Sequence, residues 1–141
     1  MASEKTEAAM KLIEKLNRTA DKIRKVQAKY VFEKKLTAPQ FAVLEILSRT
    51  GPVPLKRISD EMMVTGANIT CVVDNLEKEG FVRRVHSKED RRVILGELTP
   101  EGRKKVEGIL PEYMEKLASL TSGLTESEQK QLIALLDKLT V

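Results

Sequence analysis

The sequence predicts a mainly helical protein that carries one small antiparallel β-hairpin. The first observation is that apolar residues recur at spacings of three and four along most of the chain, as on the buried side of an amphipathic helix. The second is the pair of segments 81–85 and 93–98, which are rich in branched residues and flank a polar stretch, as two strands joined by a turn do. The third is that a threonine stands in front of several helical patterns, where a cap is needed: Thr37, Thr65, Thr99 and Thr125.

The size of the chain favours a single domain. Its 141 residues are enough for one ordinary domain and few for two. With 41% hydrophobic and 33% charged residues, the composition is that of a folded protein with many solvated helix faces. We therefore expect one domain over residues 1–141.

The first two helices are predicted from periodicity and from end signals. A long amphipathic pattern covers residues 3–32, with apolar positions at Leu12, Ile13, Leu16, Ala20, Ile23, Tyr30 and Val31. Thr37 can cap the second helix, and Gln40, three residues later, can return a bond to the amide of the cap. The second helix should run to Thr50, because a glycine and two prolines follow it closely.

A third and a fourth helix follow, joined by a tight turn. The third begins at Leu55, and the turn spans only residues 63–66, which suits two helices packed at an angle. Thr65 can cap the fourth helix, and Gly80 ends it. The predicted inward stripe of the fourth helix is Ile69, Val72, Val73 and Leu76.

The predicted hairpin and two further helices complete the chain. After the second strand, Thr99 and Pro100 begin a helix that runs to Gly123, with the proline at the first position, where its missing amide costs nothing. A capping box, Thr125 to Glu128, begins the last helix. We expect four apolar residues of the last helix to be buried: Leu132, Ile133, Leu136 and Leu139.

Several functional classes are excluded by what the sequence lacks. The single cysteine, Cys71, cannot form an internal disulfide, and together with the single histidine, His86, it does not make a zinc-ligand set. No glycine-rich phosphate loop, nucleophile elbow or paired-carboxylate motif appears. We therefore expect no enzyme activity, no metal and no cofactor.

The hydropathy pattern argues against a membrane protein. No apolar run approaches the roughly 20 residues that span a bilayer, and the N-terminal segment lacks the apolar core of a signal peptide. We expect a cytoplasmic protein without a membrane partner.

The positive charge gathers on the hairpin. The whole chain carries a net charge of +4, which permits nucleic-acid binding without requiring it. Residues 81–96 alone contain five basic and two acidic side chains, which leaves +3 on one small element. A charge run is often only a solvated face, so its position beside a polar helix decides its interpretation.

The order helix, turn, helix and arginine-rich hairpin suits a reader of duplex DNA. A helix fits the wide major groove, whereas a thin ribbon with arginine can reach the narrow, electronegative minor groove. If the fourth helix enters the major groove, its early outward residues are nearest the base edges: Gly66, Ala67, Asn68, Thr70 and Cys71. Asn68 is the best candidate for a base contact, because its amide matches N6 and N7 of adenine.

The hairpin supplies the second group of candidate contacts. Arg92 or Arg91 is predicted to enter the minor groove, and Asp90, two residues before Arg92, can orient its guanidinium. Other cations are predicted to contact phosphates, which strengthens binding without selecting a sequence: Arg83, Arg84 and Lys88, and more weakly Lys56 and Arg57.

Other interpretations of the same residues stay open. The hairpin and helix could dock an acidic protein surface, as in a protein-interaction module, or bind DNA architecturally without sequence preference. The outward side of the fourth helix could also be plain solvated surface. Cys71 is either a small neutral contact residue or a redox-sensitive thiol on the DNA-facing side.

The chain resembles the MarR family of transcription regulators over nearly its whole length. The hairpin residues Asp90-Arg91-Arg92 and the following Leu98-Thr99-Pro100-Glu101-Gly102 are similar to that family's Asp-x-Arg and Leu-Thr-x-x-Gly. The segment Leu76-Glu77-Lys78-Glu79-Gly80-Phe81-Val82 is similar to the end of its recognition helix. The sequence departs from the family at Cys71, where arginine is frequent.

The resemblance implies a winged helix-turn-helix fold and a homodimer. Residues 36–102 would form the DNA-binding lobe, and residues 1–35 and 103–141 would form helices that intertwine with those of a second subunit. Such a dimer would bind a pseudo-palindromic operator, acting as a repressor. A small effector, phenolic or anionic and aromatic, would relieve the repression.

Overall fold

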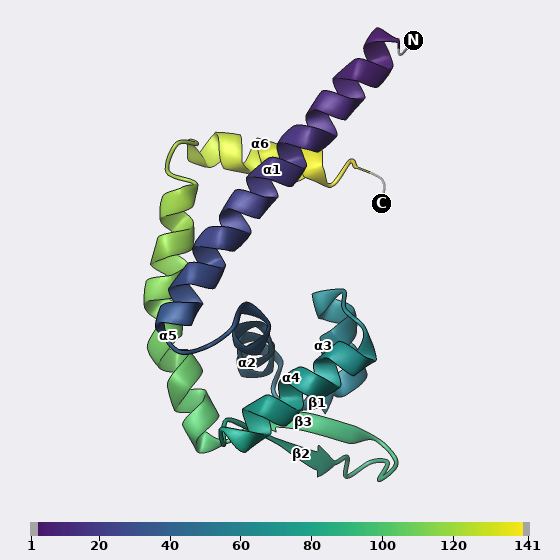
Figure 1. Ribbon diagram of the computed structural model, residues 1–141, viewed down its shortest axis with the longest axis vertical. Helices are drawn as coiled ribbons and strands as arrows, with labels where there is room; N and C mark the ends of the chain where they lie inside the picture. Colours follow the sequence, from purple (N-terminus) through teal and green to yellow (C-terminus); the bar gives the residue numbers. More distant parts are fainter. Residues whose placement is uncertain (1–2, 140–141) are drawn as a thin grey trace. The chain divides into compact units, whose positions relative to one another are not determined.

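The computed structural model describes residues 3–139 and has the mainly helical architecture that the sequence predicts (Figure 1). The elements follow one another in this order: α1 (Glu4–Glu33), α2 (Ala38–Thr50), β1 (Val53–Pro54), α3 (Leu55–Met62), α4 (Gly66–Lys78), β2 (Val82–His86), β3 (Ile94–Leu98), α5 (Pro100–Leu120) and α6 (Glu126–Leu136). The chain divides into two compact units, one up to Leu110 and one from Pro111 onward, and α5 contributes to both.

The helix starts follow the predicted caps. Thr37 accepts a bond from the Gln40 amide at 3.2 Å, and the Gln40 side chain accepts one from the Thr37 amide at 2.9 Å. Thr125 and Glu128 make the same reciprocal pair at 3.1 and 2.9 Å at the start of α6. Gly51, at φ 75°, ends α2 in a conformation that residues with a side chain rarely adopt.

The core of the first unit is built around α2, with buried side chains from the end of α1, from the turn after it and from the elements that follow α2. Burying an aliphatic or aromatic side chain contributes roughly 1.5–3 kcal/mol, so this cluster is the main source of stability. Its buried apolar residues are Tyr30, Val31, Leu36, Phe41, Val43, Leu44, Ile46, Leu47, Val53, Ile58, Ile69, Val73, Leu76, Val82, Val106 and Ile109.

The stripe predicted for α4 is correct at three of its four positions. Ile69, Val73 and Leu76 are buried, whereas Val72 is only partly buried. Ile69, Val73 and Leu76 follow one line of the helix at spacings of four and three, and Val72 lies at the edge of that line.

The two-stranded hairpin predicted from the sequence is incomplete, because the sheet has three strands in the order β1-β3-β2. Val53 of β1 pairs with Gly96 of β3, and Pro54 pairs with Leu95. The prolines around β1 indicate a helix stop in the sequence, but an edge strand also tolerates proline, which has no amide to donate to the ladder. The two predicted strands themselves are present, each beginning one residue later than expected.

A compact backbone junction joins the end of α4, the start of β2 and the start of α5. The Thr99 amide donates to the Phe81 carbonyl at 3.0 Å, and the Thr99 hydroxyl donates to the Gly80 carbonyl at 2.5 Å. The same hydroxyl accepts a bond from the Gly102 amide at 3.0 Å, so Thr99 also caps α5. A Cβ on Gly102 would collide with the Phe81 carbonyl, so only glycine fits there.

The second unit leaves much of its apolar surface exposed in the single chain. Leu132, Ile133, Leu136 and Leu139 are between 38% and 60% exposed, so the expectation that they are buried is wrong for one chain. Only α6 and the end of α5 belong to this unit, and they supply too little surface to cover these side chains.

We predict that Gly102→Ala lowers the free energy of unfolding by about 1–3 kcal/mol, the usual cost of forcing an added methyl group into a packed site. Thermal or urea unfolding followed by circular dichroism measures the change. Gly108→Ala is the matched control on the same helix, because a Cβ there meets nothing within 4 Å. It should raise stability by about 0.5–1 kcal/mol. Equal stabilities of the two variants would contradict the packing argument.

Candidate nucleic-acid interface

The helix-turn-helix is held by a left-handed turn and an ion-pair bridge. Met63 ends α3 at φ 57°, and the Val64 amide donates to the Ser59 carbonyl at 3.0 Å. Arg49 of α2 pairs with Glu61 of α3 at 2.7 Å and with Glu45 of its own helix at 3.2 Å. These two carboxylates, Glu61 first, raise the pKa of Arg49.

The N-terminal half of α4 presents the predicted reading residues to solvent. Thr65 caps the helix by accepting the Asn68 amide at 3.2 Å. The Thr70 hydroxyl donates to the Gly66 carbonyl at 3.0 Å, which leaves its oxygen as an acceptor for a ligand. The side chain of Asn68 makes no hydrogen bond within residues 3–139. All five predicted positions are exposed: Gly66, Ala67, Asn68, Thr70 and Cys71.

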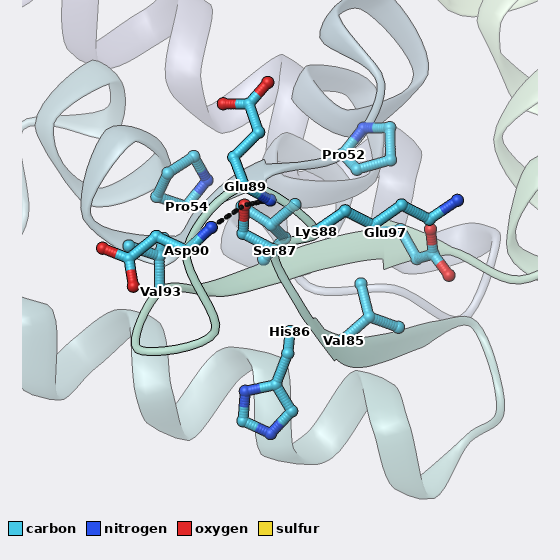
Figure 2. A pocket seen from close by; sticks show the side chains of 11 residues that line it. Pro52, Pro54, Val85, His86, Ser87, Lys88, Glu89, Asp90, Val93 and Glu97 are labelled. Atoms are coloured by element: carbon cyan, nitrogen blue, oxygen red, sulfur yellow. Dashed lines mark hydrogen bonds between the residues drawn. The ribbon is translucent and has the colours of Figure 1, made fainter.

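The wing consists of β2, β3 and the turn between them. This turn, residues 87–93, is the tip of the wing and is closed by its own hydrogen bonds. Figure 2 shows the Ser87 hydroxyl between the amides of Glu89 and Asp90, from which it accepts bonds at 3.2 and 3.4 Å. The Ser87 amide donates to the Val93 carbonyl, and the Val93 amide donates to the Asp90 carbonyl, both at 2.9 Å. The tip therefore has a defined backbone on which its cations are displayed.

The contact predicted between Asp90 and Arg92 is present as a two-point clamp. Arg92 Nε lies 3.1 Å from Asp90 Oδ1, and Arg92 Nη2 lies 3.1 Å from Oδ2. The Arg92 amide donates to Oδ1 at 3.0 Å as well. These bonds, the side-chain one first, lower the pKa of Asp90. The Arg92 side chain is still 90% exposed, so the clamp orients the guanidinium without covering it.

The remaining predicted cations fall into two groups. Arg83 pairs with Glu97 across the β2-β3 ladder at 2.6 Å, and Arg84 pairs with Asp74 at 2.8 Å and with Glu77, both on α4. The others are exposed and form no ion pair with any residue from 3 to 139: Lys56, Arg57, Lys88 and Arg91. Sequence reasoning missed the pairing of Arg84. The available signal was the pair Asp74 and Glu77, which lie one turn apart on α4.

An open depression lies between the wing tip and β1. Figure 2 shows its lining side chains, among them Pro52, Pro54, Val85 and Glu97. It is open to solvent, unlike the enclosed cavity that buries most of a small ligand. Within the described part of the chain, no three histidine, cysteine or acidic side chains gather as a metal site would require. Of the helices in residues 3–139, none is long and apolar enough to cross a membrane.

A helix-turn-helix with an exposed second helix, followed by a wing with a clamped arginine, defines a winged helix-turn-helix protein of the DNA-binding type. The family model for "MarR family" matches residues 36–94, which include α2 to the start of β3. The chain belongs to the MarR family of DNA-binding transcription regulators, which are not enzymes. This confirms the resemblance seen in the sequence.

Two curated relatives, both from Bacillus subtilis (strain 168), are similar along most of the chain. The HTH-type transcriptional regulator MhqR is 33% identical over 123 residues, which are 87% of this chain and 85% of MhqR. The uncharacterized HTH-type transcriptional regulator YkoM is 38% identical over 99 residues, which are 70% of this chain. The match spans 64% of the length of YkoM.

Two solved structures are similar in fold. A mutant MarR from E. coli, complexed with operator DNA, matches with a TM-score of 0.84 and 25% identity, covering 96% of this chain and 98% of that one. Bordetella bronchiseptica BpsR, whose DNA binding is regulated by 6-hydroxynicotinic acid, matches with a TM-score of 0.77 and 29% identity, covering 89% of each chain.

We predict that the pKa of Asp90 lies below that of an unpaired aspartate, because the side chain and the amide of Arg92 donate to its carboxylate. Because the pKa of the Asp90 carboxyl group is lowered in the folded protein, the clamp is complete at any pH above the pKa of an unpaired aspartate. It is lost only as the pH falls through the lowered pKa of Asp90. An NMR titration of the Asp90 carboxyl carbon measures this shift. In the Arg92→Gln variant, the pKa of Asp90 should rise toward that of an unpaired aspartate. A midpoint that is the same in both proteins would show that the clamp does not form in solution.

Proposed function

We propose that the protein is a homodimeric, sequence-specific repressor that binds a pseudo-palindromic operator and is released by a small effector. The observation that carries this proposal is the exposure of the α4 N-terminal half together with the clamped, exposed Arg92 of the wing. One element has the dimensions of the major groove, and the other carries the side chain that suits the minor groove.

The exposed groups divide naturally between the two grooves. In the major groove, Asn68 would read adenine, and the methyl groups of Ala67 and Thr70 would meet thymine. In the minor groove, Arg92 would place the free edge of its guanidinium against base acceptors while Asp90 holds the other edge. Four of the predicted cations, none of which forms an ion pair with a described residue, would bind phosphates: Lys56, Arg57, Lys88 and Arg91.

The dimer is proposed from the apolar surface that a single chain leaves exposed. On α1, Met10, Leu12 and Ile13 are between 47% and 64% exposed. On α6, Ile133 is 60% exposed. Large apolar surface of this kind is commonly buried by a second subunit, and a two-fold axis would set two α4 helices roughly 34–36 Å apart, one turn of duplex DNA.

Relief by a small effector follows the behaviour of BpsR, which responds to 6-hydroxynicotinic acid. We propose a phenolic or anionic aromatic compound, which would act by changing the spacing of the two α4 helices. A compound that binds the non-DNA form about 100-fold more tightly would shift the equilibrium by about 2.7 kcal/mol. That shift is enough to free a large part of the operator.

We predict that the protein enriches one two-fold symmetric motif from a pool of random duplexes. The half-sites should lie about 10 base pairs apart, centre to centre, because each subunit reads one groove on the same face of the DNA. Sequencing of the bound pool reveals the motif. Sedimentation of the complex should give two chains per duplex, each of 15.9 kDa.

Competition then separates this function from its rivals. Binding to the motif should exceed binding to a shuffled duplex by roughly 10³-fold or more at 150 mM salt. A steep salt dependence with a ratio near one would instead identify an architectural DNA binder. No binding to any duplex at low salt would favour a protein-interaction module.

We predict that Arg92→Ala weakens operator binding by about 5- to 150-fold, the effect of losing one specific groove contact. Fluorescence anisotropy with a labelled operator measures the affinity. Arg103→Ala is the control, because it removes the same charge from α5, away from the wing. If both variants bind equally well, the wing assignment is wrong.

A further inference from the structure

Arg84 of β2 reaches across to three groups on one face of α4. Its guanidinium forms ion pairs with Asp74, at 2.8 Å, and with Glu77, and Nη2 lies 3.5 Å from the Thr70 carbonyl oxygen. Residues 70, 74 and 77 follow the spacing i, i+4, i+7, so they stand above one another along the helix. One side chain of the wing therefore spans two turns of α4, the proposed reading helix.

The surroundings of Arg84 differ from those of a cation that is free to bind a phosphate. Its side chain is 25% exposed, against 90% for Arg92. Nη1 and Nη2 face different carboxylates, so both ends of the fork are already engaged. A phosphate would therefore compete with two carboxylates for this guanidinium.

The two carboxylates explain why a cation is needed at this point. Asp74 is 52% exposed on the helix that carries the reading residues, and Glu77 lies one turn further along. Without Arg84, both carboxylates would lose the one ion pair that each makes within residues 3–139. Arg84 offsets one of these two negative charges and at the same time ties α4 to β2, the first strand of the wing.

We propose that Arg84 is a positioning residue that sets the distance and angle between the reading helix and the wing, rather than a phosphate contact. This inference rests on the proposed DNA-reading function of both elements. The forked guanidinium carries the role, because it bonds two carboxylates in fixed directions, whereas the ammonium of lysine is a point charge on a flexible stem. Specificity depends on Arg84 because the helix and wing must reach their grooves together.

The test compares Arg84→Lys with the wild type on the selected motif and on a shuffled duplex. Lysine keeps the charge, so a phosphate contact would survive, but it cannot reproduce the fork. We expect the ratio of specific to random affinity to fall about 10-fold, the loss from one misplaced base contact. The affinity for shuffled DNA should stay within about 3-fold of the wild type. Arg103→Lys is the matched control and should leave the ratio unchanged.

The salt dependence on shuffled DNA gives an independent readout with Arg84→Ala and Lys88→Ala. Each lost phosphate contact reduces the slope of log K against log salt by about 0.9. We expect this reduction for Lys88→Ala and no reduction for Arg84→Ala. A slope that falls equally in both variants, or an Arg84→Lys variant with the full specificity ratio, would overturn the proposal.

Amide hydrogen exchange separates failure of this inference from failure of the proposed function. If the wild type selects no motif, the proposed DNA-reading function is wrong. Amide hydrogen exchange in the DNA-free protein still tests whether Arg84 holds α4 and β2 together. The positioning role requires faster exchange in α4 and β2 of Arg84→Lys than in Arg103→Lys. Equal exchange would overturn it. Because ion pairs of this exposure add little to stability, the variants should remain folded.

Discussion

The backbone junction at Gly80 and Phe81 is the constraint on which the rest of the first unit depends. Thr99 bonds both carbonyls, and Gly102 packs directly onto the second of them. The end of α4, the start of β2 and the start of α5 therefore share one fixed point. Because α4 ends and β2 begins beside this point, the junction fixes where the reading helix and the wing meet.

Ion pairs then divide the cations of the lobe into those that build it and those that remain available. Arg49 joins α2 to α3 through Glu61, and Arg84 joins β2 to α4 through Asp74 and Glu77. Arg92 is different, since its partner Asp90 belongs to the same turn and leaves the guanidinium exposed. Composition alone therefore overstates how much charge is available to a ligand, and geometry decides which arginine holds the fold and which one remains exposed.

Local chemistry made most of the fold predictable. Thr37 and Thr125 each specify a cap within three residues, and the α4 stripe needs only the period of a helix. Two features of the DNA-binding lobe could not be predicted from the sequence. Strand β1 exists only because distant β3 lies beside it, and the partners of Arg84 are brought to it by the fold. The exposure of Asn68 and Arg92 was predictable from their positions, whereas their roles in DNA binding stay predictions.

The two edges of the small sheet disfavour pairing with a strand of another copy of the protein. On one edge, Pro54 and the neighbouring Pro52 offer no amide hydrogen to an arriving strand. On the other edge, β2 carries the charged side chains of Arg83 and Arg84, and charge on an edge strand disfavours pairing with a strand of another molecule. A sheet with such edges is thus a poor template for stacking into fibres.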